Sequence, residues 1–127
     1  MIETNVNLEP IHYQADELTA HHLSQFIQAT RTQSANDFPL SFATLFRKAE
    51  FMWLERMNVD LRNLLHTDQE YEYFSPFQVG DIPLITTKLV QSRERKGMVF
   101  VTLATEIRVG DKPRVLATTT FVVRPPV

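Results

Sequence analysis

The chain has no cysteine among its 127 residues, which excludes thiol nucleophiles, disulfide bridges, cysteine-ligated zinc and iron–sulfur clusters. Glycine is scarce as well, since Gly80, Gly97 and Gly110 are the only three. A glycine-rich loop for a dinucleotide or a nucleoside triphosphate is therefore excluded. No apolar run approaches the roughly 20 residues that span a bilayer. The first residues do not have the pattern of a signal peptide, so we expect a cytoplasmic protein that does not enter a membrane.

The charges of the chain are nearly balanced. Thirteen basic and fifteen acidic side chains give a formal charge of −2, which disfavours nucleic acid as a partner. Hydrophobic residues make up 43% and charged residues 22% of the chain, as in an ordinary globular protein. Because a chain of this length can bury a core of its own, we predict a single domain over residues 1–127.

Two segments in the first half of the chain have apolar residues at helical spacing. Residues 19–30 begin at Thr19, a good N-cap, and predict a short amphipathic helix. Residues 41–57 predict a longer helix whose apolar side chains cover well over half of its circumference. These side chains are Phe42, Ala43, Leu45, Phe46, Ala49, Met52, Trp53, Leu54 and Met57. We therefore expect other structure to wrap most of this second helix.

From His66 onward, the apolar residues recur with the period of a β-strand. After a first strand in this region, we predict strands over residues 82–91, 98–109 and 115–123. A charged loop over residues 92–97 and a hairpin turn over residues 109–112 separate them. Helices followed by consecutive strands predict the α+β class, with an antiparallel meander wrapped around one long apolar helix.

Three segments carry a resemblance to a known family. Residues 18–30 have a Leu…Phe…Ala-Thr pattern, and residues 57–66 read MNVDLRNLLH. Residues 69–73 read QEYEY and are followed by Pro76 and by Val-Gly-Asp at positions 79–81. In this order and spacing, over roughly residues 11–124, they resemble the hot-dog fold family of MaoC-like dehydratases. The most similar type is the N-terminal or small-subunit type related to the dehydratase domain of type I fatty acid synthases.

This resemblance implies chemistry on acyl thioesters of coenzyme A or acyl carrier protein, with no other cofactor and no metal. Water would be added to, or removed from, the C2–C3 bond of the acyl chain, a lyase reaction of fatty acid metabolism. In the family, an Asp and a His in an Asp-x-Asn-Pro-x-His loop act as acid and base. A backbone N–H at the start of the central helix, usually beside a glycine, polarises the thioester carbonyl.

The chain departs from this pattern at both places. The loop over residues 31–39 reads RTQSANDFP, which contains no histidine and has Asp37 as its only carboxylate and therefore its only candidate catalytic acid. Ser41 and Phe42 stand at the start of the predicted central helix in place of a glycine. The sequence therefore predicts an (R)-specific hydratase/dehydratase relative that binds acyl thioesters but lacks its own Asp/His pair. Such a chain would act as a homo-oligomer or as the partner of an active subunit.

Other residues are candidates for catalysis. Glu50 lies inside the apolar arc of the central helix, and some hot-dog thioesterases place an acidic residue there to direct a water at the thioester. The alternative for Glu50 is a structural ion pair with Arg47 or with a partner chain. His66 follows the central helix and is either catalytic or a structural histidine hydrogen-bonded to backbone. A thioesterase that uses Glu50 and a non-enzymatic acyl-binding or assembly module are thus the alternative functions.

Candidate binding residues form two groups. Phe46 and Trp53, together with Ser41 and Phe42, would line a slot for the acyl tail, although their first expected role is in the core. Arg93, Arg95 and Lys96 of the charged loop would contact the phosphates of coenzyme A or an acidic carrier protein, unless they form a solvated hairpin tip. Because the central helix and an exposed sheet edge leave much apolar surface, we expect a homodimer or a heterodimer with another hot-dog subunit.

Overall fold

The computed structural model describes residues 8–30 and 46–124. Its elements are β1 (Ile11–Gln14), α1 (Ala20–Thr30), α2 (Lys48–Arg56), the 3₁₀ turn η2 (Leu61–Asn63), β2 (Leu64–Tyr73), β3 (Leu84–Arg95), β4 (Met98–Val109) and β5 (Lys112–Val123). Over the described ranges, no helix has the length and apolar character needed to cross a membrane.

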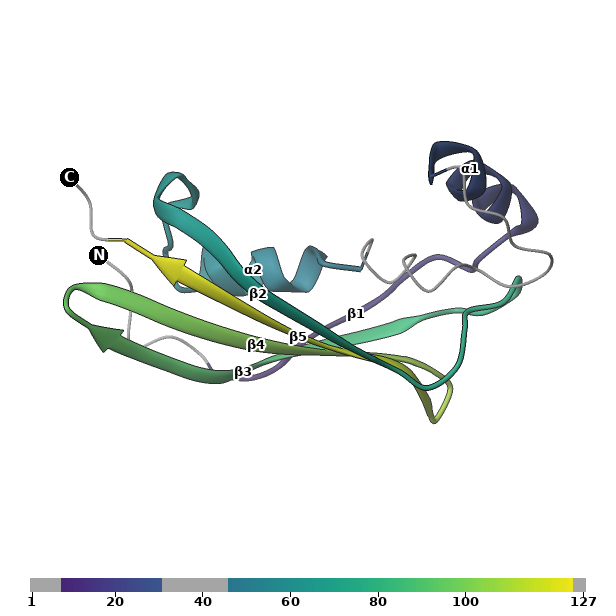
Figure 1. The fold of residues 1–127 in the computed structure, drawn as a ribbon. Coiled ribbons are helices and arrows are strands. Elements are labelled where there is room, and N and C mark those ends of the chain that lie inside the picture. The colour runs from purple at the N-terminus through teal and green to yellow at the C-terminus, as the bar shows by residue number, and fades with distance from the viewer. Residues whose placement is uncertain (1–7, 31–45, 125–127) are drawn as a thin grey trace.

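The five strands form one curved antiparallel sheet in the order β1-β3-β4-β5-β2. Helix α2 lies along the concave face of this sheet, and α1 lies beyond one end of it (Figure 1). This arrangement confirms the predicted α+β class and the sheet wrapped around a central helix. The predicted antiparallel meander of all strands is wrong, because only β3, β4 and β5 are neighbours in the sheet in the order of the sequence. Strand β2 pairs with the far edge of β5, and the unpredicted β1 pairs with β3.

The predicted charged loop between β3 and β4 is mostly strand. Arg93 and Arg95 belong to β3, where they pair with Phe100 and with Met98 of β4. The connection is a two-residue turn in which Lys96 and Gly97 have φ angles of 54° and 80°. A turn with two positive φ angles follows the twist of its strands, so the ladder continues to its tip. The hairpin turn predicted before β5 is confirmed at positions 110–111.

Helix α2 is shorter than predicted in its described part. It begins at Lys48, and the preceding Phe46 and Arg47 are not helical, while positions 41–45 lie outside the described residues. Phe51 is 46% exposed and Met52 is 39% exposed, so the prediction that other structure wraps most of the helix is wrong for the described chain. At about 100° per residue, these two side chains point away from the sheet.

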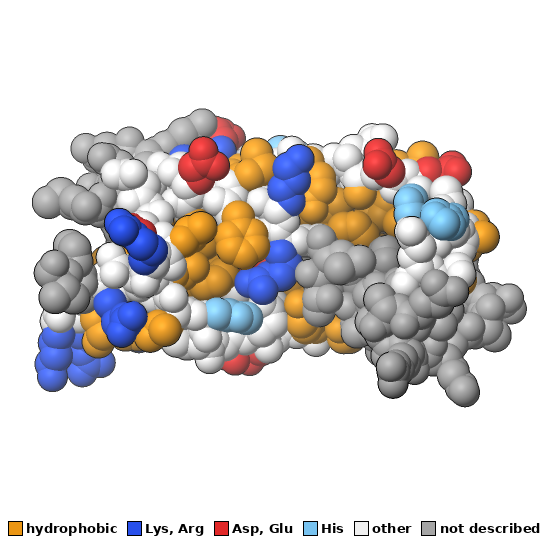
Figure 2. Space-filling model, turned by 90° about the horizontal axis from the view of Figure 1, so that it is seen from above, with side chains coloured by type: hydrophobic (Ala, Val, Ile, Leu, Met, Phe, Trp, Pro, Cys, Tyr) orange, Lys and Arg blue, Asp and Glu red, His pale blue; other side chains and the backbone are white. Residues whose placement is uncertain are grey.

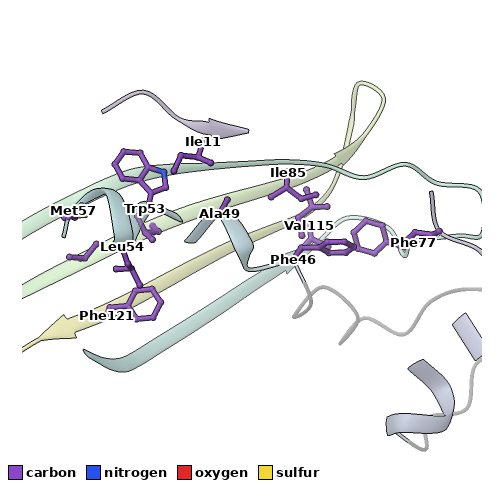
Figure 3. Packing of buried hydrophobic residues seen from close by; sticks show 14 of the residues in the cluster. Ile11, Phe46, Ala49, Trp53, Leu54, Met57, Phe77, Ile85, Val115 and Phe121 are labelled. Atoms are coloured by element: carbon purple, nitrogen blue, oxygen red, sulfur yellow. The ribbon is translucent and has the colours of Figure 1, made fainter. Parts of the chain in front are cut away.

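The core lies between α2 and the concave face of the sheet (Figure 3). Trp53 is completely buried, and its indole N–H donates a hydrogen bond of 2.8 Å to the backbone carbonyl of Thr87 in β3. Leu54 and Phe121 are also buried, at 0% and 1% exposure. Burial of each such side chain contributes roughly 2–3 kcal/mol, which fixes α2 and the residues before it on the sheet.

Candidate functional site

An ion pair stands at the start of α2. Arg47 Nε donates a hydrogen bond of 2.8 Å to Glu50 Oε2, and the Glu50 side chain is only 2% exposed. The Arg47 guanidinium also lies 5.6 Å from the centre of the Phe51 ring and 5.9 Å from that of Phe121. The first turn of a helix favours a carboxylate, because the unpaired N–H groups there carry a partial positive charge. The ion pair with Arg47 that the sequence offered for Glu50 is thus present.

Two tyrosines flank Glu50 from the two edge strands of the sheet. Burial raises the pKa of Tyr13 in β1, and the negative charge of Glu50 raises it further. Burial also raises the pKa of Tyr71 in β2, where Arg47 lowers the pKa and Glu50 raises it. Tyr71 therefore lies within electrostatic reach of both members of the ion pair. In the described part of the chain, the second carboxylate oxygen, Glu50 Oε1, is buried and has no hydrogen-bond partner.

A second polar pair joins β5 and β2. Thr119 Oγ1 of β5 donates a hydrogen bond of 2.9 Å to Gln69 Oε1 of β2. The amide nitrogen, Gln69 Nε2, is buried and finds no hydrogen-bond partner among the described residues. We did not predict Gln69 from the sequence. The available signal was its spacing from Tyr71 and Tyr73, because residues two apart on a strand share a face.

The histidines lie apart from this site. His66 is exposed on β2, its Nε2 lies 3.1 Å from the carbonyl oxygen of Asp68, and its ring centre lies 5.4 Å from that of Phe121. Within the described ranges, no hydrogen bond or ion pair joins a histidine to a carboxylate side chain. The same ranges contain no group of three acidic or histidine side chains that could hold a metal ion.

The candidate residues for the acyl tail are only partly described. Phe46 is 8% exposed and its ring centre lies 5.4 Å from that of Phe77, so it packs at the edge of the core near Glu50. Trp53 is enclosed by the core. The candidates Asp37, Ser41 and Phe42 lie outside the described residues.

The basic candidates lie on the other face of the sheet. Arg93 and Arg95 pair with Phe100 and Met98, which face away from the buried Val101. The Arg93 guanidinium lies 5.5 Å from the centre of the Phe100 ring. The structure therefore does not bring Arg93 or Arg95 to Glu50. Lys96 occupies the turn at the end of this hairpin.

The outer side of α2 forms an apolar surface. Hydrophobic side chains gather on this face of the molecule, with basic side chains among them (Figure 2). An open pocket of about 280 Å³ there is lined by Phe51, Glu55, Val59 and Leu61. Leu61 is 57% exposed, and Phe51 and Met52 are also exposed. Since a monomer seldom leaves such side chains grouped on one face, this surface is suited to contact with another chain.

Comparison with known proteins covers most of the chain. Residues 32–117 match the family model described as FAS1-like, dehydratase domain region. No curated protein matches the sequence significantly.

Solved structures are similar over nearly the whole chain. HtdX of Mycobacterium tuberculosis has a TM-score of 0.76 and 18% identity, covering 91% of this chain and 51% of HtdX. The chain thus spans about half the length of that protein. A chain of the HadBC complex, a (3R)-hydroxyacyl-ACP dehydratase of the same organism, has a TM-score of 0.71 and 17% identity. The match covers 91% of this chain and 97% of the HadBC chain. The (R)-hydratase of A. caviae has a TM-score of 0.64 and 16% identity, and the match covers 98% of this chain and 100% of the hydratase chain. At these identities the likeness shows the fold, which is the expected hot-dog fold.

Proposed function

Because the chain belongs to the family of FAS1-like dehydratase domain regions, within the MaoC-like hot-dog dehydratases, we propose that it binds acyl thioesters of coenzyme A or acyl carrier protein. The likeness to a (3R)-hydroxyacyl-ACP dehydratase and to an (R)-hydratase supports this class of ligand. Near the start of α2, Phe46 packs on Phe77 and the buried Glu50 follows, which gives the combination of apolar and polar side chains that a ligand site needs.

The second part of the proposal is that the chain lacks its own Asp/His pair. One observation carries it: the only acidic side chain buried in the described residues, Glu50, is paired with an arginine and not with a histidine. His66 bonds to backbone, and His12 lies 2.9 Å from the hydroxyl of Thr86. General acid–base catalysis of hydration needs two groups that exchange protons with the substrate. We therefore infer that an active partner supplies them.

The apolar surface on α2 supports such a partner. Phe51, Met52 and Leu61 expose hydrophobic area there, and the ten-residue strand β2 forms an edge of the sheet. A second hot-dog subunit would cover both features and remove an open strand edge. HadBC is itself a complex, which favours a heterodimer for this chain as well.

The test compares the chain alone with the chain co-expressed with a hot-dog subunit that carries the Asp-x-Asn-Pro-x-His loop. We expect the isolated protein to bind butyryl-CoA in calorimetry without hydrating crotonyl-CoA. The co-purified complex should hydrate crotonyl-CoA, and a partner without its loop histidine should abolish this activity. Hydration of crotonyl-CoA by the isolated protein would refute the proposal that the chain lacks its own Asp/His pair. If neither the isolated chain nor the complex binds acyl-CoA, the proposed class of ligand is refuted.

A thioesterase is the second candidate, and the buried Glu50 favours it. One of its carboxylate oxygens has no hydrogen-bond partner in the described protein and would be free to accept a proton from an attacking water. Free coenzyme A released from acyl-CoA would be measured with a thiol reagent. Glu50→Gln should abolish release, and Glu55→Gln on the exposed side of α2 is the matched control. Release that survives Glu50→Gln would eliminate this candidate.

A further inference from the structure

Two buried polar atoms on facing elements have complementary chemistry. Glu50 Oε1, on α2, is an acceptor, and Gln69 Nε2, on β2, is a donor; both are buried without a hydrogen-bond partner in the described residues. The second polar atom of each side chain accepts a hydrogen bond: Glu50 Oε2 accepts from Arg47, and Gln69 Oε1 accepts from Thr119. These bonds fix both side chains and leave one unused atom on each. Buried polar atoms without partners cost free energy, so each occurrence in a folded protein requires an explanation.

The neighbours of Gln69 on both strands lie close to the ion pair. Its partner Thr119 lies between Ala117 and Phe121 on the concave side of β5. Phe121 is 5.9 Å from the Arg47 guanidinium. Tyr71, opposite Ala117, is within electrostatic reach of both Arg47 and Glu50. Residues two apart on one strand face are about 7 Å apart, so Gln69 and Tyr71 border the same space under the first turn of α2.

The close-up of the core shows how the two ends of α2 pack. Phe46, just before α2, lies toward Phe77, and Leu54 lies toward Phe121 at the other end of the helix (Figure 3). Glu50 stands four residues from each, and one helical turn is 3.6 residues. Glu50 therefore stands between these two contacts in the chain, and its side chain is buried.

We propose that Glu50 and Gln69 together bind a single hydroxyl group, which is a water molecule in the free protein and the 3-hydroxyl of the acyl thioester in the complex. A hydroxyl is the group that fits, because it can donate a hydrogen bond to the carboxylate while it accepts one from the amide N–H. A carbonyl cannot donate to Glu50, and an ammonium group cannot accept from Gln69. For the 3-hydroxyl, the inference rests on the proposed acyl-thioester function.

This site would distinguish 3-hydroxyacyl chains from saturated chains. A saturated chain leaves the carboxylate and the amide without partners, whereas a 3-hydroxyacyl chain satisfies both. A site built to hydrogen-bond a hydroxyl rejects analogues that lack it, because its buried polar groups are then unpaired. Gln69 is thus a specificity-determining residue, and its role does not depend on whether the chain catalyses a reaction.

The binding experiment uses the full chain, alone and with its co-purified partner, and calorimetry with (R)-3-hydroxybutyryl-CoA and butyryl-CoA. We expect the hydroxylated ligand to bind about tenfold more tightly, which is about the combined size of two ordinary hydrogen bonds, one to Glu50 and one to Gln69. Gln69→Leu removes one of these bonds and should reduce the ratio to about threefold without weakening butyryl-CoA, because that ligand makes no bond to the amide. Gln91→Leu, at an exposed position of β3, is the matched control and should keep the tenfold ratio. Thermal unfolding of each variant monitors its folding.

A crystal structure at high resolution separates the two sources of the hydroxyl. In the free protein, a water should lie within hydrogen-bond distance of Glu50 Oε1 and Gln69 Nε2, and Gln69→Leu should remove it. In the complex, the 3-hydroxyl should take its position. Wild-type crystals with neither a water nor a ligand hydroxyl between these atoms would overturn the inference. Equal binding of the two thioesters would overturn the role in specificity. If neither thioester binds but the water is present, the proposed function fails while the hydroxyl site stands.

Discussion

Replacing Arg47 by methionine should destabilise the fold strongly, although the residue is partly exposed. Its guanidinium is the only ion-pair partner that the described residues give to Glu50, at 2.8 Å. Without it, a carboxyl group at 2% exposure would lose its partner and have both oxygens unpaired in the core. Breaking a fully buried ion pair in this way costs about 3–5 kcal/mol. Because the Arg47 side chain is 27% exposed and partly solvated, we expect a loss of about 2–3 kcal/mol.

Methionine is the informative replacement because it keeps the aliphatic stem that packs near Phe51 and Phe121. The measurement is urea unfolding followed by far-UV circular dichroism. The double variant Arg47→Met/Glu50→Met should regain at least about 2 kcal/mol relative to the sum of the single changes, since a buried pair exchanged for apolar side chains is often neutral or stabilising.

Arg108→Met is the control, since Arg108 and Glu106 form a pair at 3.9 Å in which both side chains are more than 40% exposed. Its loss should stay below about 0.5 kcal/mol. The reasoning is refuted if Arg47→Met is as mild as this control, or if the effects of the two core substitutions simply add.

Three further predictions concern the core and the turns. Trp53→Phe removes the indole donor to the carbonyl of Thr87 and leaves a cavity, so urea unfolding should show a loss of about 2 kcal/mol; a loss below about 0.5 kcal/mol would show that neighbouring side chains refill the site. Burial and the charge of Glu50 raise the pKa of Tyr13, so the unfolded chain releases this proton above about pH 10 while the folded protein retains it. The stability at pH 11 relative to pH 9 should therefore fall less in Tyr13→Phe than in the wild type, and equal losses would contradict the assignment. Gly110 has a φ of +61° and an added Cβ would meet no atom within 4 Å, so Gly110→Ala should cost only the backbone strain of about 1 kcal/mol, and an unchanged melting temperature would refute that strain.

The sheet was largely predictable where the sequence alternates and glycines mark the turns. Strand β4 has its predicted bounds, and the turn before β5 falls at Gly110. Strand β1 was missed because four residues are too few to establish a period. It forms through pairing with β3, where Ile11 stands opposite Thr87, and not through a local preference. The order of the strands in the sheet was predicted wrongly for a similar reason, since no local sequence feature indicates that β2 pairs with β5 instead of β3.

The site was predictable where a residue breaks a pattern. Glu50 stood out as a charge within an apolar arc, and its pair with Arg47 followed from helical spacing. Gln69 does not break a pattern in this way. Its spacing puts it on the same face as Tyr71 and Tyr73, but a glutamine next to acidic residues in an alternating strand is typical of a solvent-facing position. Its burial depends on the register between β2 and β5, which places it opposite Thr119. Register is a tertiary property that one sequence does not contain.

The buried ion pair is informative because stability alone does not account for it. Replacing a buried ion pair by apolar residues of similar volume is often neutral or stabilising, and a leucine at position 69 would leave no unused amide. The chain instead keeps the Arg47–Glu50 pair and Gln69, and both Glu50 and Gln69 have an unused buried atom. Buried donors and acceptors without partners lower the stability of the fold unless a ligand or a water forms the missing hydrogen bonds. On the proposed function, the chain would retain these polar side chains because it binds a hydroxylated ligand.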